Sequence, residues 1–250
     1  MPAPYSVIHF NFPGGQYLFD ARHIWNALKA KEATIPTYGS IPKQFGSDAL
    51  AIVTKSILMR LAVNKLKSTL AEVYSCSEVI QATHMLRSDN AERMKQDLLL
   101  FTDAMLFEFR SYLDLIANFT YAILNAIGKP PVAAQTLSSG LPVTVLDRSG
   151  KLRRYDFLLH LCDQLNLPSD WFKFLNNDRN LFTHESAPYC AVEVIPGTPP
   201  TFDVLIMRTN ITDFATADPE EYFRISEPQS FVDGMLALAP AVQNYIIGQI

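Results

Sequence analysis

The chain has 250 residues, of which 48% are apolar, including 16 Phe and 10 Tyr, and its formal net charge is −4. This apolar content can fill a sizeable core and excludes wholesale disorder, and the net acidity argues against broad binding along a nucleic-acid backbone. Cys76, Cys162 and Cys190 are far apart and form no C-x-x-C pair, so neither a zinc knuckle nor a disulfide framework is expected.

The sequence carries no pattern typical of export or of a membrane anchor. The segment Met1–Tyr5 lacks a basic region followed by an apolar run, so we expect no signal peptide. The apolar stretch 113–127 contains Asp114, Asn118 and Asn125 and is too polar to span a bilayer. Because isolated thiols suit a reducing compartment, we expect a cytoplasmic protein with no membrane partner.

The N-terminal third predicts one strand and two helices. Residues 5–12 form a short strand pattern that Pro13-Gly14-Gly15 ends. A helix is predicted from Asp20, a suitable N-cap, to Lys31. Residues 36–46, with two prolines and two glycines, predict a loop, and a long helical pattern then runs from Ser47 or Asp48, with or without a restart, to about Leu86.

The middle of the chain predicts three further helices. The most apolar helix covers 90–127 and is stopped by Gly128 and the following Pro130-Pro131. Residues 131–150 predict a loop with a hairpin that pairs 143–145 with Leu152 around the turn 148–150. Shorter helices are predicted over 154–165 and from Pro168-Ser169-Asp170 to about Glu185.

The C-terminal part predicts a hairpin and one last helix. Residues 189–195 and 202–207 form its two strands, and the helix 230–247 should kink or split at Pro240. The predicted fold class is therefore mainly α, a helical bundle with small β-hairpin additions. We expect a single domain over 1–250 with four segments: an N-terminal strand and helix extension (1–46), a helical core (47–187), a β-hairpin (188–210) and a C-terminal helix (211–250).

The helix from Ser169 to Glu185 carries the candidate site. Phe172, Leu175 and Phe182 share one face of this helix, and Arg179 falls on the same face. A guanidinium on an apolar face is unusual, because an anion or several acceptors must offset its desolvation.

Asn180 and His184 are four residues apart and lie one above the other, so Arg179, Asn180 and His184 can converge on one pocket. Arginine can hold a phosphate through two parallel hydrogen bonds, and an imidazole can move a proton near neutral pH. Asparagine can orient either group or bind the substrate. The three residues together favour phosphoryl chemistry.

The segment 179–184 (RNLFTH) resembles the signature of HEPN domains, in which an arginine is followed by Asn, Asp or His and, after a gap of four to six residues, by a histidine. The resemblance implies a HEPN-like bundle and a metal-independent endoribonuclease in which a ribose 2′-hydroxyl attacks its own 3′-phosphate. It implies that His184 is the general acid or base, that Arg179 stabilises phosphoryl charge and that Asn180 fixes the geometry. It further implies a homodimer whose two motifs face each other, with RNA as substrate and a role in defence or as a toxin.

A fourth site residue is predicted on the helix 90–127. Glu108 lies on the apolar face of that helix, whereas Asp103 and Asp114 point to the other side. Because a buried glutamate and a buried arginine in one domain suggest each other as partners, we expect Glu108 to contact or face Arg179.

Each of these residues also has a simpler interpretation. Arg179 can be half of a structural salt bridge, His184 can serve the helix dipole alone, and Asn180 can face solvent. The alternative function is a non-catalytic module that binds a nucleotide or a protein, and a third is an interaction subunit that docks a partner through the hairpin 189–207.

The remaining ionisable residues suggest no metal set and one basic patch. The other histidines are scattered, at His9, His23, His84 and His160. We therefore expect neither a metal nor a cofactor. The densest basic cluster is either an ordinary exposed turn or a patch that contacts RNA, and it comprises Arg148, Lys151, Arg153 and Arg154.

Overall fold

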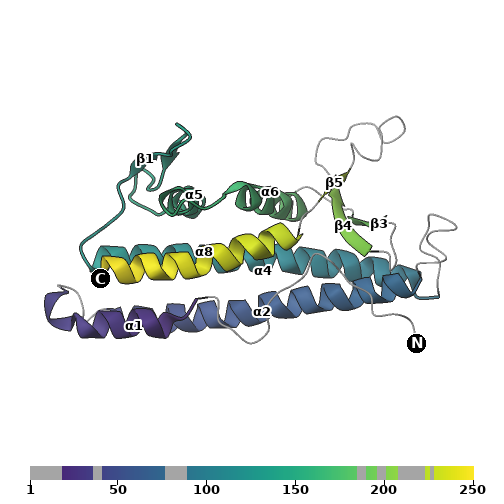
Figure 1. The fold of residues 1–250 in the computed structure, drawn as a ribbon, viewed down its shortest axis with the longest axis horizontal. Coiled ribbons are helices and arrows are strands. Elements are labelled where there is room, and N and C mark those ends of the chain that lie inside the picture. Colours follow the sequence, from purple (N-terminus) through teal and green to yellow (C-terminus); the bar gives the residue numbers. More distant parts are fainter. Residues whose placement is uncertain are drawn as a thin grey trace. The chain divides into compact units, whose positions relative to one another are not determined.

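A computed structural model describes most of the chain and shows a mainly α-helical protein with small antiparallel sheets, as the sequence predicts (Figure 1). The described residues are 19–35, 41–76, 89–184, 190–195, 201–207, 223–225 and 228–250. The predicted strand at 5–12 and the continuation of the second helix beyond residue 76 lie outside the described residues.

The helices are α1 (Ala21–Ala30), the short 3₁₀ helix η1 (Glu32–Thr34), α2 (Ile41–Ser75), α4 (Ala91–Ala126), α5 (Arg154–Gln164), α6 (Asp170–His184) and α8 (Pro228–Gln249). The strands are β1 (Ala134–Thr136), β2 (Pro142–Thr144), β3 (Cys190–Ile195), β4 (Thr201–Met207) and β5 (Phe223–Ile225).

Two predicted helix ends are confirmed by their capping groups. The carboxylate of Asp20 accepts a hydrogen bond from the backbone N–H of Arg22 at 2.9 Å and so caps α1. After α4, Gly128 adopts a φ of 77°, and the N–H of Lys129 reaches back to the carbonyl of Leu124. Glycine adopts this positive φ readily because it has no Cβ to clash, which makes it a common residue just after a helix.

The helix α2 begins earlier than predicted, since residues 41–46 are helical and not part of a loop. Pro42 stands in the first turn, where its missing N–H costs nothing. Phe45 then packs between Trp25 and Phe119, with ring centroids 5.2 and 5.4 Å away. This tertiary contact outweighs the turn preference of Gly46, which is exposed.

The small sheet near α5 differs from the predicted hairpin. The strand β2 pairs with β1, in the register Ala134–Thr144, while Leu146 and Leu152 form only an isolated bridge. The turn between these two residues does exist, and the Asp147 carboxylate holds it by accepting from the backbone N–H groups of Ser149 and Lys151 at 2.8 and 2.9 Å. The predicted hairpin is therefore present only as this bridge and turn, and the N–H of Arg153 donates to the carbonyl of Val145 at 2.8 Å. The pairing of β2 with β1 was not predicted, because β1 is three residues long and lacks the apolar alternation typical of a strand.

The predicted C-terminal hairpin is confirmed as the antiparallel pair β3–β4, with Cys190 opposite Ile206 and Ile195 opposite Thr201. The structure adds β5, which pairs with β4 through Leu205 and Ile225 and gives the order β3-β4-β5. Of the two outcomes predicted at Pro240, the split does not occur, since α8 runs unbroken from Pro228 to Gln249 with Pro240 on its exposed side, and the kink stays a prediction.

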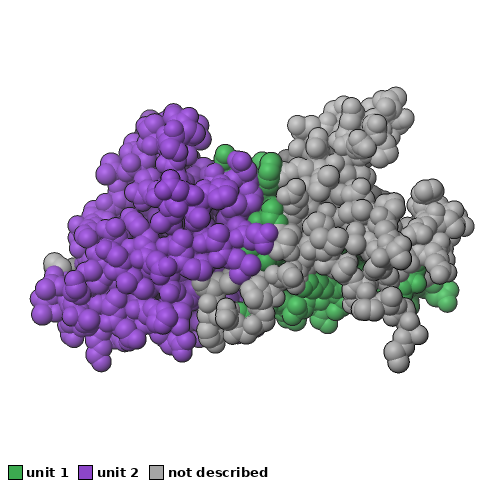
Figure 2. All heavy atoms as spheres, in the orientation of Figure 1, with its two compact units in different colours: residues 1–13, 59–108, 173–232 green, residues 14–58, 109–172, 233–250 purple. Residues whose placement is uncertain are grey.

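The chain forms two compact units, and each is built from three separate stretches of sequence (Figure 2). Unit 1 comprises 1–13, 59–108 and 173–232, and unit 2 comprises 14–58, 109–172 and 233–250. The helices α2, α4, α6 and α8 therefore contribute residues to both units.

Heptad-like spacing explains how α2 builds the core of each unit. Its buried positions recur alternately every four and three residues, which keeps one stripe of the helix facing its neighbours. The positions of this stripe are Ile52, Ser56, Met59, Val63, Leu66, Leu70 and Val73, and Ala62 and Thr69 are buried beside it. The core of unit 2 also contains Phe19, which packs edge-on against Phe119 at 5.5 Å, and Phe157, which packs against Tyr121 at 6.4 Å.

Candidate active site

The predicted motif lies in the C-terminal half of α6 and belongs to unit 1. The apolar face of this helix is confirmed at Phe172 and Leu175, which are both fully buried. Arg179 follows on the same face. Its side chain is half-buried and its Nε is shielded from solvent. The helix thus presents a cation at the margin of its apolar face, as the spacing predicts.

Two of the three motif residues touch each other. The Nη1 of Arg179 donates a hydrogen bond to the Oδ1 of Asn180 at 3.3 Å, and Asn180 is exposed. The backbone of His184 forms the last residue of α6, and its side chain lies outside the described residues.

The positive charge of Arg179 acts on a carboxyl group of α4, that of Asp103. Partial desolvation raises the pKa of Asp103 above its ordinary value, and the positive charge of Arg179 acts in the opposite direction and lowers it. The sequence pattern had placed Asp103 on the side of α4 away from Glu108. Sequence reasoning missed Asp103 because nothing in the α4 pattern shows which exposed carboxylate α6 approaches.

The fourth predicted site residue, Glu108, is half-buried on α4 and lies in the same unit as Arg179. This partial burial agrees with the prediction that Glu108 lies on the apolar face of the helix. A direct contact between Glu108 and Arg179 stays a prediction.

The predicted basic cluster lies in unit 2, whereas the motif lies in unit 1. Among the described residues, no three or more His, Cys, Asp and Glu side chains gather in a way that could hold a metal ion. Within the described parts of the chain, every helix is too short or too polar to cross a lipid bilayer.

Comparison with known proteins gives no relative: no protein-family model, no curated protein and no solved structure matches this chain. The chemistry of the described side chains and the motif that they carry are therefore the basis for any functional assignment.

Proposed function

We propose that the protein is a HEPN-type endoribonuclease that cleaves RNA in the cytoplasm without a metal ion. The observation that supports this most is the hydrogen bond from half-buried Arg179 to exposed Asn180 on α6, one turn before His184. These three residue types in this order are the ones that the resemblance assigns to catalysis.

In the proposed reaction the ribose 2′-oxygen bonds to the adjacent phosphorus and the bond from phosphorus to the 5′-oxygen breaks. The products are a 2′,3′-cyclic phosphate and a 5′-hydroxyl, so the proton lost by the 2′-hydroxyl is balanced by one gained at the 5′-oxygen. His184 moves the proton, because an imidazole changes its charge near neutral pH. Arg179 stabilises the charge that develops on the phosphoryl oxygens, and Asn180 holds the guanidinium in place.

The test is cleavage of a mixed RNA pool by the purified full chain, with a metal chelator present. We expect wild-type protein to leave 2′,3′-cyclic phosphate ends and to spare DNA, which lacks the attacking 2′-hydroxyl. His184→Ala and Arg179→Ala should each lower the rate at least about 100-fold, the size of contribution typical of general acid–base and electrostatic groups.

A matched control comes from the same helix. Asn177 is exposed on α6 outside the motif, so Asn177→Ala should cleave at the wild-type rate while Asn180→Ala slows cleavage. Circular dichroism and urea unfolding establish that each variant is folded. Wild-type protein that cleaves no RNA, or a folded His184→Ala that cleaves normally, would rule out the nuclease.

The position of Asp103 favours one rival function, a non-catalytic module that binds a nucleotide or a protein and in which Arg179 is half of a structural ion pair. A carboxylate within electrostatic range of Arg179 competes with a phosphate for the guanidinium, as a structural ion pair does. The same experiment separates the two functions, since the rival predicts RNA or nucleotide binding with no cleavage at all. It also predicts that Asp103→Asn strengthens anion binding at Arg179.

The resemblance further suggests that two copies of the motif act together. We propose a homodimer, and light scattering of the purified chain across a range of protein concentrations tests it. A protein that remains monomeric while cleaving RNA would remove the dimer from the proposal and leave the chemistry of the single site.

A further inference from the structure

An open pocket in unit 2 gathers most of the basic cluster that the sequence singles out. Its volume is about 440 Å³. Its lining residues come from the turn before α5, from the first residues of α5 and from one side of α4: Arg110, Asp114, Lys151, Leu152, Arg153, Arg154, Tyr155 and Asp156. Arg148, the remaining member of the cluster, is exposed and does not line the pocket.

The lining has an excess of positive charge. It contains the four cations Arg110, Lys151, Arg153 and Arg154 and the two carboxylates Asp114 and Asp156, which leaves a formal charge of +2. The carboxylates hold the arginines in place. The ion pairs join Arg110 to Asp114 at 2.5 Å, Arg153 to Asp156 at 2.9 Å and Arg154 to Asp114 at 3.6 Å.

Outside the lining, the carboxylate of Asp147 lies near Lys151. The electrostatic attraction between them is one of the causes that lower the pKa of Asp147, after the hydrogen bond from Ser149 and that from the backbone N–H of Lys151. Because Asp147 already accepts these hydrogen bonds within its own turn, it only partly offsets the Lys151 charge.

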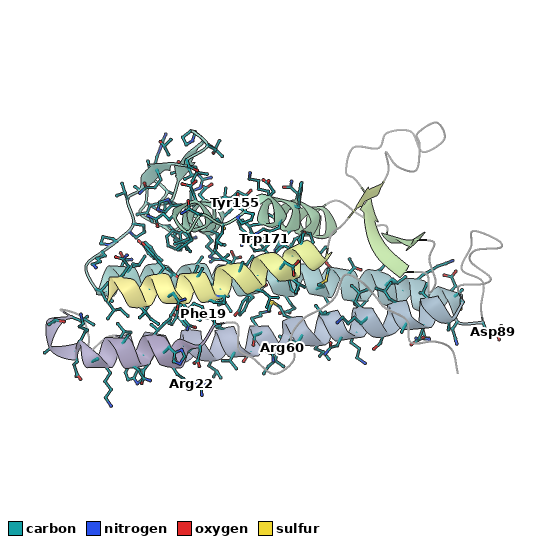
Figure 3. The ribbon with its side chains drawn as sticks, viewed as in Figure 1. Phe19, Arg22, Arg60, Asp89, Tyr155 and Trp171 are labelled. Atoms are coloured by element: carbon teal, nitrogen blue, oxygen red, sulfur yellow. The ribbon has the colours of Figure 1, made fainter. Side chains whose placement is uncertain are left out.

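Aromatic rings pack against one of the cations that line this pocket. The guanidinium carbon of Arg110 lies 5.3 Å from the centre of the Phe172 ring, and Phe172 stacks on Tyr155 with centroids 5.0 Å apart. The side chain of Arg110 is only 12% exposed, so this cation is fixed before any ligand arrives. Figure 3 labels Tyr155 on α5 and Trp171 on α6, next to Phe172 in the sequence.

The backbone adds donors to the same place. The helix α5 has 11 residues and begins at Arg154, and its N-cap residue, Arg153, makes no side-chain capping hydrogen bond. The N–H groups of a first helical turn have no partners within the helix, and they attract an anion together with the helix dipole. The N–H of Arg153 donates to the carbonyl of Val145 at 2.8 Å, which fixes the entry of the chain into α5.

We propose that this pocket binds a phosphate monoester carried on an organic group of up to mononucleotide size. A monoester phosphate is close to a dianion at neutral pH, which matches the +2 charge of the lining. The volume lies in the range of small-ligand sites and exceeds what a bare phosphate fills, and the lining includes Tyr155 and Leu152, whose side chains suit an organic group. This site is independent of the motif in unit 1 and of the proposed ribonuclease activity.

The experiment is isothermal titration of the full chain with AMP, 3′,5′-cyclic AMP and adenosine. We expect AMP to bind with one-to-one stoichiometry, cyclic AMP to bind at least tenfold more weakly because its diester is only a monoanion, and adenosine not to bind. Lys151→Ala and Arg153→Ala should each weaken AMP binding at least about tenfold, the effect of removing one charge-assisted hydrogen bond.

Arg148→Ala is the matched control, because it removes a cation from the same turn without touching the pocket. It should leave AMP binding unchanged, and so should His184→Ala and Arg179→Ala, which separates this site from the nuclease proposal. A short oligodeoxynucleotide with a 5′-phosphate, compared with the same strand ending in a 5′-hydroxyl, distinguishes a strand end from a free nucleotide as the source of the monoester.

Binding of AMP or of the 5′-phosphorylated strand, lost in Lys151→Ala or Arg153→Ala and retained in Arg148→Ala, supports the pocket. The proposal is overturned if neither phosphorylated probe binds, or if wild type and folded Lys151→Ala bind equally. It is also overturned if Arg148→Ala weakens binding as much as the pocket variants do. Lys151 is exposed in a turn, so its substitution should leave the fold intact.

Discussion

Gly234 lies on α8 at a point where the indole ring of Trp171 from α6 comes against the helix backbone. A Cβ added at this position would overlap the ring atoms Cδ2 and Cε2 of Trp171. The ring has little freedom to move away, because its Nε1 donates to the carbonyl of Pro168 at 2.9 Å and the side chain is 7% exposed. The absence of a side chain at residue 234 is what allows these two groups to meet.

We predict that Gly234→Ala lowers the free energy of unfolding by about 1 to 3 kcal/mol, the usual cost of overpacking a core. Urea unfolding followed by tryptophan fluorescence measures this change. Gly248→Ala is the control, since it lies on the same helix with open space around it and should raise stability by up to about 1 kcal/mol through helix propensity. Equal effects of the two substitutions would show that the contact with Trp171 does not make a side chain at residue 234 destabilising.

The burial of His160 on α5 predicts how the stability of the protein depends on pH. It is 8% exposed, and burial lowers its pKa from the ordinary value of 6.5, against an opposing attraction from Asp163. The unfolded chain therefore takes up a proton at a higher pH than the folded chain does, and stability falls as the pH drops below about 6.5.

We predict that the loss of unfolding free energy between pH 7 and pH 5 is smaller in His160→Gln than in the wild type, because glutamine does not titrate. Urea unfolding at the two pH values measures the difference. The carboxylates with lowered pKa values, Asp20, Asp147 and Asp163, lose their contributions at lower pH, below the ordinary Asp value of 3.8. An identical pH dependence in both proteins would contradict the assignment to His160.

At the scale of elements, α8 keeps its helical path through a proline. The imide of Pro240 donates no hydrogen bond to the turn before it, yet the helix continues on both sides. Its neighbours Leu238, Ala239 and Val242 are buried, whereas Pro240 itself is exposed. The packing of the buried side of α8 therefore outweighs the local cost of the proline.

We predict that Pro240→Ala stabilises the protein by about 2 to 3 kcal/mol in urea unfolding. The gain in helix propensity of about 3 kcal/mol is reduced by the greater freedom of the unfolded chain, worth up to about 1 kcal/mol. Leu236→Ala on the same helix should have no such stabilising effect. A loss of stability in Pro240→Ala would contradict this and would mean that the fold requires the proline at this position.

The elements that the sequence predicted well are those whose signals are local. Asp20 caps α1, Gly128 ends α4, and the hairpin β3–β4 alternates as a strand pair should. The errors occur where contacts with residues distant in the sequence determine whether a segment is helix, strand or loop. Phe45 extends α2 across a predicted loop through contacts with Trp25 and Phe119, and β1 and β5 are too short to show a periodicity of their own.

For the candidate site, too, the sequence predicted local features and missed those that depend on contacts between helices. Helical spacing placed Arg179 beside Phe172 and Leu175, and the structure confirms that this face is buried. The proximity of Asp103 to Arg179 depends on how α4 and α6 approach each other, which no single-sequence pattern encodes. The pocket lined by Arg110 and Arg153 was likewise visible only in part, because Arg110 is forty residues from the basic turn in the sequence.

At the scale of the whole molecule, the two proposed sites belong to different units. The arginine–asparagine pair belongs to unit 1, and the basic pocket belongs to unit 2. The two sets of substitutions proposed for them, at residues 179–184 and at 151–153, therefore act on separate parts of the chain. Their effects on cleavage and on nucleotide binding should be independent of each other.

The interleaving of the two units also limits how the protein can be dissected. Each unit draws on three stretches of sequence, and α2, α4, α6 and α8 each cross from one unit to the other. Truncation at any of these crossings would sever a helix and expose its apolar stripe, so shortened forms of the protein should aggregate instead of yielding an isolated half. Point substitution in the intact chain is consequently the route by which the two sites can be assigned.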